Sequence, residues 1–253
     1  MDGQVDPARI ARVARALADP DLCCFQEVEG EAQAEALMRG FPGYSAHAAW
    51  AVDVPSSDGG RLRFGNLVLS RLPVGRVIRH SLAWPAQADS PSMPRVALEA
   101  AVLAPWGWVR ITTTHLEYYS SRQRAAQLAQ LADIDAEARS QAAAPASVKY
   151  ATGPFAPQPR PAEGIVTGDF NTTAADAALD ALRRAHSDAW ETAHPGRPHP
   201  PSFFVHDRAS GTAPYCCDFV FVAKALAPRI ESVRIDAQTQ ASDHQPVVVR
   251  FRD

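Results

Sequence analysis

The sequence repeats one arrangement five times: a short apolar run ends in an acidic, amide or imidazole side chain. Apolar runs of this length are typical of buried strands, and the ends of strands are where a rigid sheet presents reactive groups. The five segments are Gln26 and Glu27, residues 114–117, residues 168–171, Asp218 within the apolar run 216–222, and residues 242–244. The pattern therefore predicts a protein built on sheets, with polar groups gathered at strand ends.

Helical periodicity separates these strand-like runs. Residues 7–18 place apolar side chains at i, i+3, i+4 and i+7, with Asp6 suited to cap the helix and Pro7 to its first turn. Further helices are expected at 31–39, 120–141 and 176–185, and further strands at 44–52, 61–70, 73–84, 95–103, 107–115, 165–167, 229–236 and 246–252. Strands and helices that alternate in blocks favour two packed sheets with helices outside.

The length of 253 residues, 46% of them hydrophobic, suits one α/β domain with a large core, and we expect residues 1–253 to form it. Residues 142–163 are rich in Ala and Pro without periodicity, which predicts a long surface loop. The formal net charge of -3 gives no sign of a nucleic-acid backbone as partner, although a local basic groove stays compatible with it.

The cysteines form two adjacent pairs, Cys23 with Cys24 and Cys216 with Cys217. Neighbouring strand residues point to opposite faces, so one pair cannot readily present both sulfurs to one metal ion. Reduced cysteines in a core are the expected interpretation. No apolar run approaches the roughly 20 residues of a membrane span, and the start lacks the pattern of a secretory signal. A cytoplasmic monomer with no transmembrane segment is therefore expected.

The polar strand ends supply mostly oxygen ligands, which suit a hard cation such as Mg²⁺ or Mn²⁺ better than zinc. Taken singly, each residue has a plainer interpretation. Asp169 precedes a helix and could only cap it, and a lone histidine is more often a satisfied surface or core residue.

The ordered series resembles the motifs of the endonuclease/exonuclease/phosphatase family. The matching segments are Phe-Gln-Glu-Val at 25–28, Gly-Asn-Leu-Val-Leu-Ser-Arg-Leu-Pro at 65–73, Thr-His-Leu-Glu at 114–117 followed by Arg122, Arg124 and Gln127, Gly-Asp-Phe-Asn at 168–171, Asp-Phe-Val-Phe-Val at 218–222 and Ser-Asp-His-Gln-Pro at 242–246. The resemblance implies a four-layer α/β sandwich and divalent-metal-dependent hydrolysis of a phosphoester. Because family members act on nucleic acid, phospholipid head groups or sugar phosphates, the substrate stays open among these.

The resemblance also implies roles for single residues. Glu27 would be the main metal ligand and Asp243 a further one, while Asp169 would orient or deprotonate the attacking water and Asn171 would hydrogen-bond that water or a phosphoryl oxygen.

Three further residues gain roles in the same way. His244 would contact the phosphate, with Asp218 fixing its tautomer and raising its pKa. His115 matches a position that contacts phosphate or protonates the leaving group.

The remaining candidates are weaker. Asn66 and Arg95 could contact substrate, Arg95 as a phosphate clamp, or either could belong to the scaffold. Three aromatic side chains could stack on a substrate, although aromatic side chains are more often buried. They are Trp84, Tyr118 and Tyr119.

The chain departs from the family at its start, where members carry a strand that ends in Asn and helps to bind the metal or phosphate. Met1 to Asp6 is similar to the loop that follows that strand, so the first strand is expected to be missing. Either the true start lies upstream and the recorded chain is N-terminally truncated, or this is a catalytically impaired, phosphoester-binding member. A truncated chain is expected to leave a gap beside the strand of residues 168–171, with unpaired backbone groups.

Overall fold

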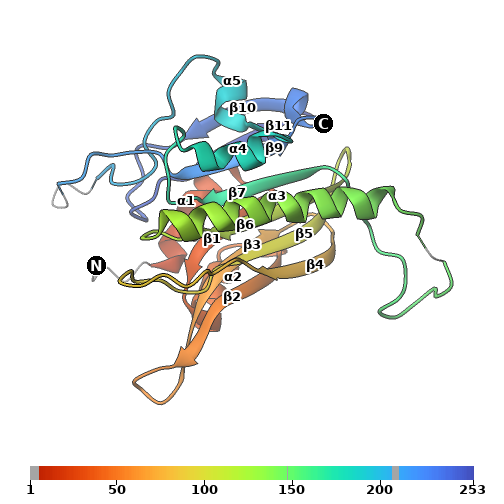
Figure 1. The fold of residues 1–253 in the computed structure, drawn as a ribbon, viewed down its shortest axis with the longest axis horizontal. Coiled ribbons are helices and arrows are strands. Elements are labelled where there is room, and N and C mark those ends of the chain that lie inside the picture. Colours follow the sequence, from red (N-terminus) through yellow and green to blue (C-terminus); the bar gives the residue numbers. More distant parts are fainter. Residues whose placement is uncertain (1–5, 147, 207–210) are drawn as a thin grey trace.

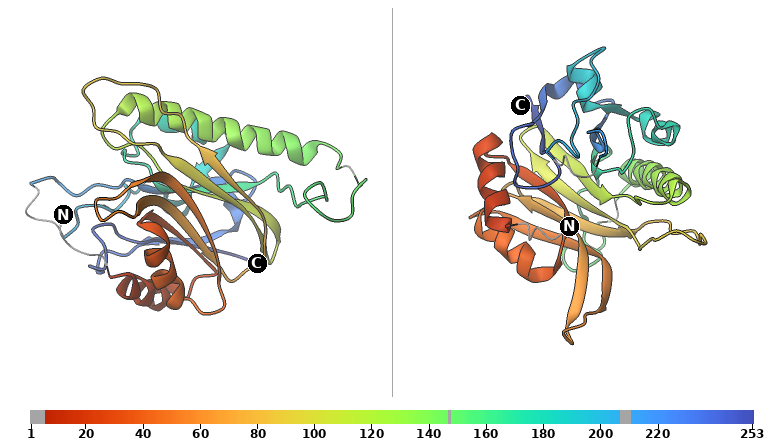
Figure 2. Two further views of the ribbon diagram at one scale, coloured as in Figure 1. Left: turned by 90° about the horizontal axis from the view of Figure 1, so that it is seen from below. Right: turned by 90° about the vertical axis from the view of Figure 1, so that its left-hand side faces the viewer.

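Two layers of β-structure lie between two layers of helix in the computed structural model, which describes residues 6–146, 148–206 and 211–253. The right-hand view of Figure 2 shows the order: the red helices, the orange strands, the yellow-green strands and then the green helix. This is the expected α/β sandwich, and its fold class is confirmed.

The first helical layer contains α1 (Pro7–Ala18) and α2 (Gly30–Arg39). As expected, the Asp6 side chain caps α1 by accepting from the Ala8 backbone N–H at 2.9 Å. Ala11 of α1 and Leu37 of α2, together with Phe41 just after α2, pack onto the neighbouring sheet. Burial of these faces, more than helix propensity, holds such short helices in place.

The adjacent β-layer is divided into two hydrogen-bonded sheets. One has the order β1-β3-β2 and the other pairs β10 with β11, all antiparallel. The strands are β1 (Leu22–Val28), β2 (Ser45–Pro55), β3 (Arg61–Ser70), β10 (Ile230–Ile235) and β11 (Val247–Phe251).

The second β-layer is one six-stranded sheet of order β4-β5-β6-β7-β9-β8. Only the β6–β7 pair is parallel. The strands are β4 (Val74–Ser81), β5 (Val96–Ala104), β6 (Gly107–His115), β7 (Gly164–Asp169), β8 (His186–Asp188) and β9 (Asp218–Ala223).

The core between the β-layers joins both small sheets to the large one. Val222 and Ile165 of the large sheet share a cluster with Leu22 of β1 and with Val247 and Val249 of β11. The opposite face of the large sheet packs on the outer helices, chiefly α3 (Ser121–Ala143), which Figure 1 shows in green across the whole sheet. η1 (Ala177–Leu179) and α4 (Asp180–Arg183) also pack on this face, whereas α5 (Ala189–Ala193) packs with the core between the β-layers. The remaining short element, η2 (Ala227–Arg229), directly precedes β10.

The segment between α3 and β7 corresponds to the expected Ala/Pro-rich loop. The helix continues to Ala143, two residues into the expected range, and the described residues 144–146 and 148–163 contain no helix or strand. Figure 1 shows this segment extending away from the sheets before it returns to β7. None of the helices in the described ranges combines the length and apolarity that crossing a bilayer requires.

The expected vacancy beside the strand of residues 168–171 is a wrong prediction. β7 is paired on both sides, with β6 and with β9. Within the described part of the chain, the strands that have only one partner are β1 and β2, β10 and β11, and β4 and β8. The error arose because the polar motif of β7 belongs to the six-stranded sheet, whereas Glu27 is carried by the opposite β-layer.

Gly168 allows β6 and β7 to approach closely next to the site. Its φ is +138°, and a Cβ atom there would lie 1.9 Å from the Thr114 carbonyl oxygen. Gly168→Ala is therefore expected to lower the free energy of unfolding by about 3 kcal/mol or more, through both backbone strain and the clash.

Urea unfolding with Gly153→Ala as control tests this expectation. Gly153 also has a positive φ, +82°, but a Cβ there meets no atom within 4 Å, so its substitution should cost only about 1 kcal/mol of backbone strain. Equal losses of free energy of unfolding in the two variants would contradict the explanation that Gly168 is needed for the close approach of β6 and β7.

Candidate active site

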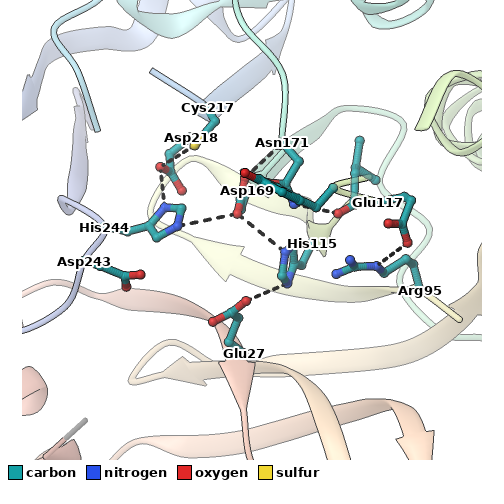
Figure 3. Close-up of polar contacts among 12 residues, drawn as sticks. Glu27, Arg95, His115, Glu117, Asp169, Asn171, Cys217, Asp218, Asp243 and His244 are labelled. Carbon is teal, nitrogen blue, oxygen red and sulfur yellow. Dashed lines mark hydrogen bonds and ion pairs between the residues drawn. The ribbon is translucent and has the colours of Figure 1, made fainter. Parts of the chain in front are cut away.

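Glu27 reaches the site through an irregularity in β1. The register with β3 shifts between Phe25 and Val28, and Glu27 has a φ of +57°, in the left-handed region that bulky residues seldom adopt. A bulge of this kind redirects a side chain at the end of a strand. The Glu27 side chain is 59% exposed, and its carboxylate points toward the neighbouring layer (Figure 3).

Three expected residues lie in one row across the six-stranded sheet. His115 at the end of β6 is the register partner of Asp169 on β7, and Asp169 is in turn the partner of Asp218 on β9. Directly opposed residues of paired strands share a face, so the row brings an imidazole and two carboxyl groups together. This registration could not be predicted from any single motif.

Asp169 is buried, and its two oxygens have different surroundings. Oδ1 accepts from the Asn171 backbone N–H at 2.8 Å, which forms a tight turn with Asn171 at a φ of +49°. Oδ2 lies 3.5 Å from His115 Nε2 and 3.7 Å from His244 Nε2. The Asn171 side chain donates from Nδ2 to the Leu116 carbonyl at 2.8 Å, which fixes the turn beside β6.

His244 and Asp218 form the hydrogen bond that the sequence analysis expected, with 2.9 Å between Nδ1 and Oδ2. Ser202 Oγ donates to the same Asp218 oxygen at 2.6 Å and accepts from the Asp218 backbone N–H at 3.2 Å. Phe203 stacks on the imidazole at 4.3 Å between ring centroids. These contacts fix the ring and direct its Nε2 toward Asp169.

The charge states of these groups follow from their surroundings. Burial raises the pKa of Asp169 to about 7, helped by the charge of Asp218. For His244, burial acts against the charged form, but the hydrogen bond and charge of Asp218 outweigh it and raise the pKa to about 9. Burial lowers the pKa of His115 well below its usual value, and Arg95 and His244 add to this. At neutral pH the site therefore contains one cationic and one neutral imidazole.

Arg95 precedes β5 and lies beside the row, with Glu117 as its partner. Its Nε donates to Glu117 Oε2 at 3.4 Å, and both side chains are buried. Within the described residues, Arg95 Nη1 has no hydrogen-bond partner. Figure 3 shows the guanidinium directed toward His115, an orientation suited to an anion at the site.

Asn66 lies deeper in the structure than expected for a substrate contact. It is 2% exposed, and its Nδ2 donates to the Val96 carbonyl at 2.9 Å, next to Arg95. This contact ties β3 to β5 and so joins the two β-layers near the site. No hydrogen bond or ion pair found in the described chain connects Asn66 with Asp169 or either histidine.

A hard cation fits the acidic side of the site. Glu27 and Asp243 direct their carboxylates into the space below His115 and His244 (Figure 3). Loss of hydration raises the pKa of Glu27, and the like charge of Asp243 adds to this against the opposing charge of His244. Glu27 Oε1 is 3.8 Å from His115 Nδ1, a nitrogen without a hydrogen-bond partner among the described residues. Carboxylates crowded in this way are the donors that Mg²⁺ and Mn²⁺ select.

The three aromatic candidates are exposed and not buried. Trp84 is 51% exposed, Tyr118 45% and Tyr119 63%, and the two tyrosines pack edge to face at 4.9 Å. Tyr118 and Tyr119 directly follow Glu117, so they lie at the rim of the site.

Ser202, Phe203 and Cys217 were not identified from the sequence as site residues. Ser202 and Phe203 belong to an irregular segment that is tied in by isolated bridges of Phe203 with Tyr215 and His244. Because this segment is neither helix nor strand, no hydrophobic periodicity distinguishes Ser202 or Phe203 in the sequence. Cys217 was assigned to a core, and its Sγ lies 3.6 Å from Asp218 Oδ2. The only available signal was its position next to Asp218.

The protein is thus an α/β sandwich whose facing β-layers carry acidic and imidazole groups at their strand ends. The model of the endonuclease/exonuclease/phosphatase family matches residues 3–244, so the chain belongs to this family. No curated protein matches the sequence closely enough to count as a relative.

Solved structures share the fold across nearly the whole chain. An endonuclease/exonuclease/phosphatase from Bacteroides vulgatus has a TM-score of 0.70 and 19% identity, covering 98% of this chain and 91% of its own. A mannosyl-6-phosphatase from Bacteroides thetaiotaomicron has a TM-score of 0.71 and 17% identity, with coverages of 98% and 91%. A 3′ phosphatase from Neisseria, bound to a product DNA hairpin, has a TM-score of 0.60 and 20% identity, with coverages of 96% and 94%.

Proposed function

We propose that the protein is a divalent-metal-dependent phosphoester hydrolase that directs water onto a phosphorus atom. The observation that carries this proposal is the position of Asp169 Oδ2, 3.5 Å from His115 Nε2 and 3.7 Å from His244 Nε2. A basic oxygen between two groups that can hold an anion is what attack on a phosphate requires. Family membership supports the same chemistry, because the family contains phosphoesterases.

Glu27 and Asp243 would hold Mg²⁺ or Mn²⁺ at the acidic side of the site. The cation would neutralise charge on the phosphoryl oxygens as the transition state forms. The side chains would then have to orient the water and move its proton.

Asp169 would act as the base. A pKa raised to about 7 gives it a higher affinity for the proton of water than an ordinary carboxylate has, while about half of the groups remain ionised at neutral pH. Its Oδ1 is held by the Asn171 backbone N–H, so Oδ2 is the atom that faces the site. The Asn171 side chain, fixed on the Leu116 carbonyl, would position the water through its amide oxygen.

His244 and His115 would stabilise the phosphate in different ways. Protonated His244 would donate from Nε2 to a phosphoryl oxygen, since Asp218 occupies its Nδ1. His115, neutral because burial lowers its pKa, would donate a hydrogen bond without adding charge. Arg95 would clamp a second oxygen through Nη1, which has no hydrogen-bond partner among the described residues.

The substrate would be a phosphoester of a nucleic acid, a phospholipid head group or a sugar phosphate. The structural relatives support the first and third of these classes, as one is a mannosyl-6-phosphatase and another is bound to a DNA product. We further propose that the enzyme is monomeric and cytoplasmic. Its four cysteines, all within the described residues, are free thiols, as a reducing compartment would maintain them.

Metal removal tests the proposal. Purified protein is assayed against plasmid DNA, single-stranded DNA, sphingomyelin, phosphatidylinositol phosphates and sugar phosphates with Mg²⁺ or Mn²⁺. Excess EDTA is expected to abolish turnover, and the divalent cation should restore it, because the charge of the cation is needed in the transition state. Undiminished cleavage in EDTA would refute metal dependence. A folded protein that binds phosphoesters yet turns none over would instead identify an impaired, binding-only family member.

A further inference from the structure

The geometry points to a second cation site beside the proposed Mg²⁺ site, one that takes a thiophilic ion such as Zn²⁺ or Cd²⁺ and blocks the enzyme. Its ligands are Asp169, His244 and Cys217. The inhibitory consequence rests on the proposed function, whereas binding of the ion does not.

The three ligand atoms are already gathered. One donor atom from each of Asp169, Cys217 and His244 lies within 4.8 Å of the other two. His244 Nε2 and Asp169 Oδ2 are 3.7 Å apart, close to the ~3.4 Å that two ligands at ~2.0–2.1 Å subtend around a tetrahedral zinc ion. Small side-chain shifts would bring all three donor atoms within coordinating distance of one ion.

The hydrogen bonds around these atoms leave the required nitrogen and oxygen facing the site. Asp218 occupies Nδ1 of His244, so Nε2 faces Asp169, and a carboxylate on the far nitrogen is the usual support of a zinc-bound histidine. The Asn171 N–H occupies Oδ1 of Asp169, which leaves Oδ2. Three protein ligands with a fourth position open to water form an ordinary zinc coordination sphere.

The Cys217 thiol makes the proposed site selective for thiophilic ions. Sulfur ligands select Zn²⁺ and Cd²⁺ over Mg²⁺, whereas Glu27 and Asp243 offer only hard oxygen donors on the other side of His244. Burial, together with Asp169 and Asp218, raises the pKa of the Cys217 thiol far above its ordinary value, so the free protein holds Cys217 as an inert thiol. Binding must therefore form a metal–sulfur and a metal–nitrogen bond, and both the thiol proton of Cys217 and the Nε2 proton of cationic His244 must leave to solvent.

Occupancy would stop catalysis by removing two groups at once. The ion would take Asp169 Oδ2 from the water and His244 Nε2 from the phosphate. Inhibition by Zn²⁺ should then be relieved by a chelator and should depend on Cys217, a residue with no part in the proposed reaction.

The first test measures binding without turnover. Cd²⁺ is titrated into the apoprotein, and thiolate-to-metal charge transfer is followed by ultraviolet difference absorption together with proton release in weak buffer. One equivalent should produce the band and release about two protons, one from Cys217 and one from His244, and cadmium NMR should indicate a single sulfur ligand. Absence of the band, or a shift indicating no sulfur or several, would overturn the site.

Matched variants identify the sulfur. Cys217→Ser should lose the band, whereas Cys216→Ser should keep it, because the Cys216 Sγ contacts the Asp218 backbone carbonyl at 3.4 Å and lies in a separate core cluster. With Mg²⁺-supported turnover as readout, Cys217→Ser should raise the Zn²⁺ concentration needed for half inhibition at least about tenfold. A retained band or equal inhibition in Cys217→Ser would refute the assignment; Cys217→Ala serves if the serine variant does not fold.

Discussion

Asp169→Asn is expected to lower kcat/KM by about 10³-fold, within the range that a positioned general base contributes. Asparagine keeps the shape of the side chain and can still accept from the Asn171 N–H through its amide oxygen, but it cannot take a proton from water. Initial rates with the responsive substrate at saturating Mg²⁺ measure the loss.

Stability separates this effect from misfolding. The pKa of Asp169 is raised to about 7 in the folded protein, above the ordinary value of roughly 3.9, so the folded state binds this proton more tightly than the unfolded state does. In the wild type, ionisation of Asp169 therefore lowers the free energy of unfolding as the pH rises from about 4 through 7. In the metal-free protein at pH 8, Asp169→Asn should unfold at the same or a higher urea concentration than the wild type.

Asp176→Asn is the matched control for this substitution. Asp176 caps η1 through the Ala178 N–H, a role that asparagine fills equally well. Its activity should stay within about twofold of wild type. Loss of activity in both variants, or full activity in Asp169→Asn, would contradict the role of Asp169 as base.

His244→Ala is expected to lower kcat by about 10²- to 10³-fold, the loss seen when one preorganised donor to a developing anion is removed. The pKa raised to about 9 keeps the imidazole protonated at neutral pH, so the variant loses a charge as well as a hydrogen bond. The exposed His206, which contacts only the Ala237 carbonyl at 3.1 Å among its described hydrogen bonds, supplies the control His206→Ala.

Asp218→Asn should lower kcat less than His244→Ala does. Adding Asp218→Asn to His244→Ala should lower kcat little further. Asp218 acts through His244, so the double variant is expected to resemble His244→Ala alone. Multiplicative losses in the double variant would mean that Asp218 acts on the substrate or metal independently of the imidazole.

Much of the fold could be predicted because the apolar residues of most helices and strands recur with a clear periodicity. The strands expected at 61–70 and 107–115 have those bounds in β3 and β6, and Asp6 caps α1 as expected. β8 was not predicted, because a three-residue strand, His186–Asp188, is shorter than any window in which alternation can be detected. The helix expected at 176–185 is divided into η1 and α4.

The site could be predicted as a set of residues but not as an arrangement. Strand-end motifs indicated Glu27, Asp169 and His244, yet nothing in the chain indicated that β1 and β7 belong to opposite layers. For this reason a gap was expected beside β7, which is paired on both sides. Ser202 was missed because its contact with Asp218 joins an irregular segment to β9, and long-range contacts of this kind carry no local sequence signal.

The central claim is that Asp169 and its neighbours direct solvent water onto phosphorus. Turnover in water enriched in the heavy oxygen isotope, with mass spectrometry of both products, tests it most directly. The wild type is expected to place one solvent oxygen on the phosphoryl product and none on the alcohol, at a rate that falls with Asp169→Asn. Solvent oxygen in the alcohol, or no hydrolysis of any phosphoester by folded, metal-loaded protein, would contradict the account.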